Sequence, residues 1–106
     1  MAKYLVEATY TTEGVRGLLK DGGSKRRAAV EAVVKAVGGT LEAFYFGFGS
    51  TDVYALVDGV DASTAAAIGL TVSGSGAVHT KTTVLLTPEE IDKACQTTIA
   101  YRAPGA

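Results

Sequence analysis

Alternation of apolar and polar residues marks four stretches of the chain as β-strands. The first, KYLVEATY at residues 3–10, places every second side chain on the same side of a strand. Similar patterns predict strands at residues 40–48, 52–57 and 77–86, with a tight hairpin at GST between the second and the third. The chain is therefore expected to form a sheet of four strands.

Helical spacing of apolar residues fills the first gap between strands. Residues 11–20 predict a short helical turn, which the DGGS segment interrupts. A longer helix is expected from Lys25 to about Val37, because its valines recur at i, i+3, i+4 and i+7. Ser24 is a suitable N-cap for this helix, and the glycines at 38 and 39 are suitable stops.

Two more helices are expected later in the chain. An Ala-rich helix opens at Asp61 or Ser63 and ends before the SGSG segment. Thr87, Pro88 and Glu90 have the pattern of a capping box with proline at the first helical position, which predicts a short final helix. That helix contains the single cysteine, Cys95, which we expect to be a small buried apolar residue.

This order of elements, β-α-β-β-α-β followed by a short C-terminal helix, predicts an α+β protein with a ferredoxin-like fold. Right-handed crossovers place both main helices on one face of a four-stranded antiparallel sheet. We expect residues 1–96 to form one domain and residues 97–106 to form a C-terminal tail.

Strict alternation then assigns each strand residue to one of the two faces of the sheet. The residues expected beneath the helices are Val6, Ala8, Leu41, Ala43, Val53, Ala55, Val57, Val78 and Val84. The residues expected on the open face are Leu5, Glu7, Thr9, Phe44, Phe46, Phe48, Tyr54, Leu56, His79, Lys81, Thr83 and Leu85. A register error of one residue would exchange the two faces.

Three phenylalanines on an open face would make a larger apolar patch than soluble monomers usually expose. A second copy of the same sheet is the simplest cover, so we expect a homo-oligomer that is at least a dimer. A cleft on this face could take a small apolar or partly aromatic molecule. The candidate ligand-binding residues are Glu7, Phe44, Phe46, Tyr54 and His79.

Composition and charge narrow the classes of partner. The chain has 106 residues, 47% of them hydrophobic and 20% charged, with a formal net charge of −1. This near-neutral balance argues against nucleic acid or an anionic membrane as partner. The first residues show no basic region followed by an apolar core, and no run of 18 apolar residues occurs, so a cytoplasmic protein without a membrane span is expected.

Few residues are candidates for catalysis or for binding a cofactor. His79 is the only histidine, and on the predicted sheet it or Lys81 could approach Glu7 for proton transfer, although an intersubunit hydrogen bond is the alternative. The residues offer no protein-only metal site and no assigned cofactor, while one axial histidine would suffice for haem. The DGGSKRR segment at residues 21–27 has glycines and cations that could hold a phosphate, but a solvated helix start is the default interpretation.

Three segments together resemble the GYD domain family: KYLVEATYTTEGVRGLL, the block from SKRRAAVEAVV to STDVYALVD, and GAVHTKTTVLLTPEE. The resemblance covers about residues 3 to 90 and implies a ferredoxin-like fold with assembly of the dimeric α/β-barrel type. The signature of the family falls on Gly49 and Asp52, with Thr51 in the tyrosine position.

The resemblance implies no established activity, so whether the protein is an enzyme stays open. Proteins of related fold include monooxygenases, isomerases, haem-handling enzymes and ligand-sensing regulators, and fold analogy does not choose among these functions. Two hypotheses follow. The chain is a binding or catalytic module with a ligand cleft, or it is a structural or interaction unit whose aromatic faces fill one another.

Overall fold

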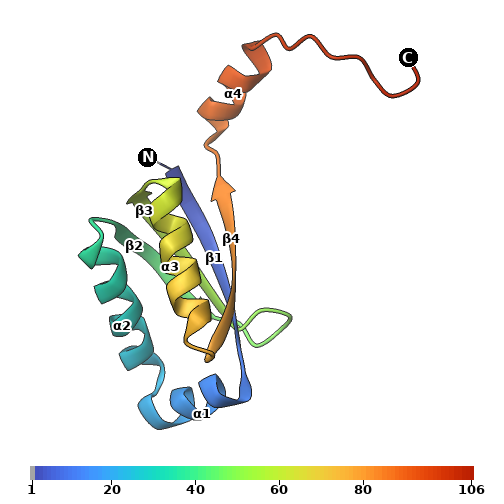
Figure 1. The fold of residues 1–106 in the computed structure, drawn as a ribbon. Helices are drawn as coiled ribbons and strands as arrows, with labels where there is room; N and C mark the ends of the chain where they lie inside the picture. Colours follow the sequence, from blue (N-terminus) through green and yellow to red (C-terminus); the bar gives the residue numbers. More distant parts are fainter. Residues whose placement is uncertain (1) are drawn as a thin grey trace.

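The computed structural model of the chain describes residues 2–106. Four strands form one antiparallel sheet in the order β2-β3-β1-β4, and four helices accompany it (Figure 1). The strands are β1 (Ala2–Tyr10), β2 (Thr40–Phe46), β3 (Val53–Val60) and β4 (Val78–Leu85). The helices are α1 (Thr12–Asp21), α2 (Gly23–Ala36), α3 (Ala62–Gly74) and α4 (Pro88–Gln96). This confirms the α+β class, and the order of elements is compatible with a ferredoxin-like fold.

The first helical region differs from the prediction in two details. Residues 12–21 form a full helix, α1, in which the side chain of Thr11 accepts a hydrogen bond from the backbone N–H of Gly14. Ser24 does not cap α2, because this helix begins at Gly23, two residues earlier than expected, and its N-cap, Gly22, makes no side-chain hydrogen bond. Gly22 provides the break between α1 and α2 with a φ of 82°, a conformation that glycine adopts without strain.

N-caps at the other two helices agree with the sequence, although α3 continues to Gly74, inside the SGSG segment that was expected to follow its end. Asp61 accepts a hydrogen bond from the backbone N–H of Thr64 at 2.8 Å, and hydrogen bonding with Thr64 lowers the pKa of this carboxyl. At α4, the Thr87 side chain accepts from the N–H of Glu90, whose carboxylate accepts from the N–H of Thr87. The predicted capping box is thus confirmed.

Irregular pairing in β2 changes which face its aromatic residues occupy. Leu41 pairs with Val57 on β3, but the register shifts between Leu41 and Ala43, so that Ala43 pairs with Leu56 and Phe44 with Ala55. Such a β-bulge inserts one residue and reverses the alternation that follows it.

The bulge and the end of β2 at Phe46 make the predicted placement of four residues wrong. Phe44 and Phe46 pair with residues that face the helices, so they do not lie on the open face. Ala43 pairs with open-face Leu56, so it does not face the helices. Phe48 lies beyond the end of β2, in the loop before β3. The faces predicted for β1 and β3 need no such correction, because the pairing of Glu7 with Tyr54 and of Ala8 with Val53 follows the expected alternation.

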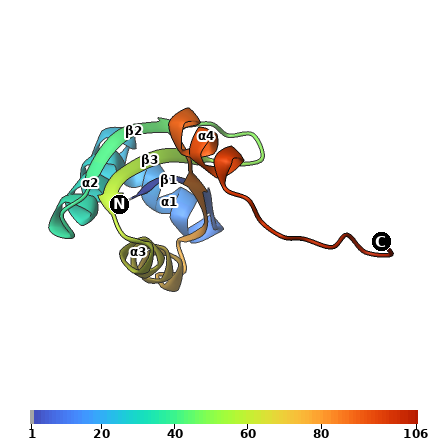
Figure 2. The same cartoon turned by 90° about the horizontal axis from the view of Figure 1, so that it is seen from above.

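Val53, Ala55 and Val78 are buried between the sheet and the helices, and a core cluster lies there toward one end of the strands. Its buried members are Tyr4, Val34, Val57, Val60 and Ala65. Helix α2 packs against β2 and α3 packs against β4, so the two helices cover opposite margins of the sheet (Figure 2). The central strands β3 and β1 therefore lie beneath the space between α2 and α3.

Helix α4 and the residues after it extend beyond the end of the sheet (Figure 1). Seen from above, they lie on the side of the sheet opposite α2 and α3 (Figure 2). Every residue of α4 is exposed, including Cys95, so the expectation that this cysteine is buried is wrong. The prediction failed because the helix leaves the body of its own chain. Within residues 2–106, no helix combines the length and the apolar character needed to cross a membrane.

Candidate functional site

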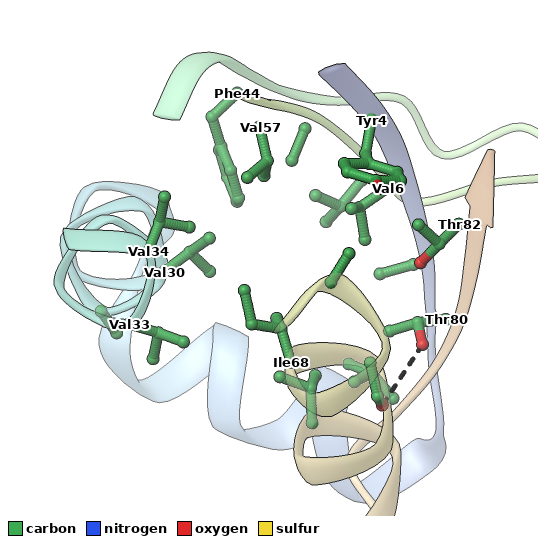
Figure 3. Close-up of a pocket in the computed structure, with 18 of the residues that line it drawn as sticks. Tyr4, Val6, Val30, Val33, Val34, Phe44, Val57, Ile68, Thr80 and Thr82 are labelled. Atoms are coloured by element: carbon green, nitrogen blue, oxygen red, sulfur yellow. Dashed lines mark hydrogen bonds between the residues drawn. The ribbon is translucent and has the colours of Figure 1, made fainter. Parts of the chain in front are cut away.

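A cavity of about 170 Å³ lies between the sheet and helices α2 and α3 (Figure 3). The sheet contributes one wall through side chains from all four strands, among them Val6, Phe44, Val57 and Thr82. The helices contribute the other wall, principally Val30, Val33 and Val34 of α2 and Ala65, Ile68, Gly69 and Val72 of α3. Nearly all of these groups are hydrocarbon, so the cavity is suited to an apolar molecule.

Small residues on both walls account for the space. Ala8 and Ala55 lie on neighbouring central strands, and Ala65 and Gly69 lie on the facing side of α3. Helix α2 packs over β2 and α3 packs over β4, so the two helices cover opposite margins of the sheet. Short side chains beneath a gap between two helices leave a volume that the chain itself does not fill.

Hydroxyl groups of β4 form the most polar part of the sheet wall. The Thr80 and Ser73 hydroxyls are hydrogen-bonded at 2.9 Å. The Thr80 hydroxyl also donates to the carbonyl of Gly69 at 3.5 Å (Figure 3). Thr80 thereby ties α3 to the edge strand. Thr82 also lines the cavity, and a Cβ on Gly69 of α3 would lie 3.9 Å from its hydroxyl oxygen.

An aromatic row runs along the helix-facing side of β2 and into the following loop. The Phe44 and Phe46 rings meet edge to face with centroids 5.3 Å apart, and the Phe46 and Phe48 rings stack at 6.0 Å. Such contacts between rings add to the stabilisation from burial alone. Phe44 lines the cavity, whereas the Phe46 ring lies against the start of α2, where a Cβ on Gly23 would approach it to 3.1 Å.

A second hollow lies on the open face, near the loop that joins β2 to β3. It is lined by Glu7, Thr9, Ser50, Thr51, His79, Thr80 and Lys81 and is open to solvent. Glu7 pairs across the strands with Lys81, and the Thr51 hydroxyl donates to Oε1 of Glu7 at 3.2 Å. The predicted proximity of Glu7 to His79 and Lys81 is therefore present, but on a solvent-exposed surface.

The five predicted ligand-binding residues thus separate onto two faces. Phe44 lines the apolar cavity, and Phe46 shares its side of the sheet. Glu7 and His79 line the open hollow, and Tyr54 lies beside Glu7 on the paired strand. The valine stripe of α2 was the sequence signal for the cavity, but this stripe predicts a packed core equally well.

The signature positions Gly49 and Asp52 belong to the loop between β2 and β3. The backbone N–H of Tyr10 donates to Oδ2 of Asp52 at 2.9 Å, and the N–H of Asp52 donates to the carbonyl of Ala8 at 3.0 Å. Asp52 therefore fixes the loop to the end of β1. Gly49 is exposed, and a Cβ placed there would meet no atom within 4 Å.

Residues 2–106 bring together no group of three or more His, Cys, Asp or Glu side chains that could hold a metal ion. The single ion pair among these residues joins Lys3 to Glu42 at the bulge, at 2.8 Å. The hydrogen bond with Glu42 raises the pKa of Lys3. The structure therefore offers two surfaces for function, the apolar cavity and the mixed open face.

Comparison with protein families shows to which family the chain belongs. The model of the GYD domain family matches residues 4–95, which include all four strands and all four helices except the first two residues of β1 and the last residue of α4. The chain belongs to the GYD domain family. The match confirms the resemblance predicted from the sequence. No curated protein and no solved structure matches this GYD domain.

Proposed function

We propose that this GYD domain is a homodimeric binding module that holds a small apolar molecule, about the size of one aromatic ring, in the cavity between the sheet and helices α2 and α3. The observation that supports this proposal is the volume of about 170 Å³ inside a wall of aliphatic and aromatic side chains. For comparison, an apolar cavity of about 150 Å³ in another protein stays dry and binds benzene.

The distribution of polar groups favours binding over acid–base catalysis at this site. Glu7 and His79, the candidate pair for proton transfer, lie on the other face of the sheet. Thr80, which does line the cavity, has its hydroxyl engaged with Ser73 and Gly69. A ligand in the cavity would therefore be held mainly by burial of its apolar surface.

Dimerisation is the second part of the proposal, and the open face supports it. Leu5 and Leu56 pair at the centre of this face, and Tyr45 pairs with Tyr54 beside them. Tyr45 is 70% exposed and Tyr54 is 37% exposed in the single chain. A second copy placed against these residues would bury apolar surface that the chain leaves in water, as the dimeric α/β-barrel type of assembly implies.

A titration with toluene tests the cavity. We would follow the methyl ¹H–¹³C resonances of Val33, Val34 and Val57, which line the cavity, and use those of exposed Val37 as an internal reference. Saturable shifts confined to the cavity methyls are expected, with a dissociation constant of about 1 mM or below. Native mass spectrometry of the purified protein would show whether a molecule of similar size is already bound.

Two matched variants identify the site. Val33 and Val37 are 43% and 45% exposed, but only Val33 lines the cavity. Val33→Phe should therefore occupy the cavity and abolish toluene binding, whereas Val37→Phe should leave it unchanged. Equal binding by both variants, or no binding by the unmodified protein, would reject the cavity as a ligand site and favour a purely structural dimer.

A further inference from the structure

One charged residue on the cavity wall indicates which kind of apolar molecule the cavity would bind. Resting on the binding function proposed above, we infer that the natural ligand joins an apolar body to an anionic group, and that Arg26 on α2 holds the anion. Arg26 is partly buried and is the single charged residue that lines the cavity. The other polar lining residues carry only hydroxyl groups: Tyr4, Tyr10, Thr80 and Thr82.

No acidic side chain of the described chain neutralises Arg26. The only ion pair within 4.0 Å among residues 2–106 is between Lys3 and Glu42. The first turn of α2 contains no acidic residue, and the residues at i−4, i−3, i+3 and i+4 from Arg26 are Gly22, Gly23, Ala29 and Val30. An arginine that lines an apolar cavity and forms no ion pair within the described residues is suited to an anion supplied by a ligand.

The surroundings of Arg26 strengthen this assignment. Lys25 and Arg27 flank it, and cations near the N-terminus of a helix interact unfavourably with the helix dipole. An anion bound by Arg26 would reduce this repulsion. The sequence explains the basic DGGSKRR segment as a solvated helix start. Through Arg26, which lines the cavity, this segment would also bind the anionic group of the ligand.

The position of Arg26 gives the ligand a direction. Arg26 lies one turn after Gly23, at the end of the sheet where α1 and α2 meet and where Tyr10 ends β1 (Figure 1). Toward its opposite end the cavity is lined by the core cluster residues Tyr4, Val34, Val57 and Ala65. The apolar body would therefore point toward the core cluster, and the anionic group would lie at the end near α1.

Two probes with the same apolar body test the inference: toluene and 4-methylbenzoate. The carboxylate can accept two parallel hydrogen bonds from a guanidinium, and a charge-assisted bond of this kind corresponds to about tenfold or more in affinity. We therefore expect 4-methylbenzoate to bind at least tenfold more tightly than toluene. In Arg26→Met, which keeps an unbranched aliphatic stem, this preference should disappear while toluene affinity changes less than about twofold.

Arg27→Met is the matched control, because Arg27 is the neighbouring, exposed residue and does not line the cavity. It removes the same net charge and should preserve the preference for 4-methylbenzoate. Toluene binding without a preference for the acid, or a preference that survives in Arg26→Met, would overturn the inference and leave the cavity proposal standing. Failure of both probes to bind would overturn the two together.

Discussion

On the helix-covered face of the sheet, β1 contributes Tyr4, Val6 and Ala8 to an apolar cavity. On the open face, the same strand presents Leu5, Glu7 and Thr9, two of which line a polar hollow. Successive side chains of one strand thus belong to two environments. Hydrophobic binding is possible on one side, while the titratable pair Glu7 and His79 lies on the other, so the sheet separates these two kinds of chemistry.

The bulge in β2 makes this separation possible. Without the extra residue between Leu41 and Phe44, strict alternation would place Leu41 beneath the helices and both Phe44 and Phe46 on the open face. With it, all three apolar side chains share the helix side, and the open face keeps Ala43 and Tyr45 from this strand. A single inserted residue therefore moves the Phe44 and Phe46 rings from the expected dimer interface to the helix side of the sheet, where Phe44 lines the cavity.

The largest expected effect comes from comparing a tyrosine on each face. Tyr4 belongs to the buried core and is 6% exposed, whereas Tyr54 on the open face is 37% exposed. Tyr4→Ala should lower the free energy of unfolding by about 3 kcal/mol, because it leaves a cavity in the packed end of the core. Tyr54→Ala should cost less than about 1 kcal/mol in the dissociated chain.

Urea denaturation at several protein concentrations measures the loss of unfolding free energy in each variant and shows whether that loss depends on association. If the open face is a dimer interface, the loss in Tyr54→Ala depends on protein concentration, because dissociation is then linked to unfolding. The loss in Tyr4→Ala should not depend on concentration in this way. Equal losses for the two variants would contradict the assignment of the two tyrosines to a core and a surface.

The next prediction concerns a charge introduced at the centre of the open face, which tests the proposed dimer interface. Leu56 pairs with Leu5 on one side and Ala43 on the other, so Leu56→Lys would bury an unpaired ammonium in the proposed interface. Such a buried, unpaired charge costs about 3 kcal/mol or more, which corresponds to at least a hundredfold weaker dimer. Sedimentation velocity at micromolar concentration should show dimers for the unmodified chain and monomers for the variant.

Leu70→Lys is the matched control, because Leu70 is 76% exposed on α3 and does not line the cavity. It introduces the same charge on the helix side of the molecule and should leave the dimer intact. A dimer that survives Leu56→Lys but not Leu70→Lys would place the interface on the helices, and a monomeric unmodified chain would remove the dimer from the proposal.

Local signals in the sequence were sufficient for most of the fold. The capping box of Thr87 and Glu90 and the Asp61 cap act within three residues, so their meaning does not depend on distant parts of the chain. Alternation in β1 and β3 also predicted the correct faces. The bulge could not be predicted in this way, because Glu42 and Ala43 are neither glycine nor proline and do not mark an irregular position.

The site was less predictable than the fold because it depends on the distance between elements. Val30 and Val33 have the spacing of core residues, and only the separation of α2 from α3 over the sheet makes them cavity walls. Arg26 was similarly ambiguous, since a basic residue in a helical first turn is usually solvated. The burial of Cys95 was predicted wrongly for the same reason. The local sequence specifies the helix that contains Cys95, but it does not specify what that helix packs against.

The smallest expected effect concerns α4, which lies on the open-face side of the sheet and is exposed throughout (Figure 2). Thr87→Ala removes the cap of a nine-residue helix, and loss of such a cap costs about 1 kcal/mol of helix stability. Because short isolated helices are marginal in water, hydrogen exchange should accelerate in α4 alone, with the midpoint of global unfolding nearly unchanged. If the variant also weakens the dimer, α4 is docked on the partner's open face, and that face is then larger than the sheet alone.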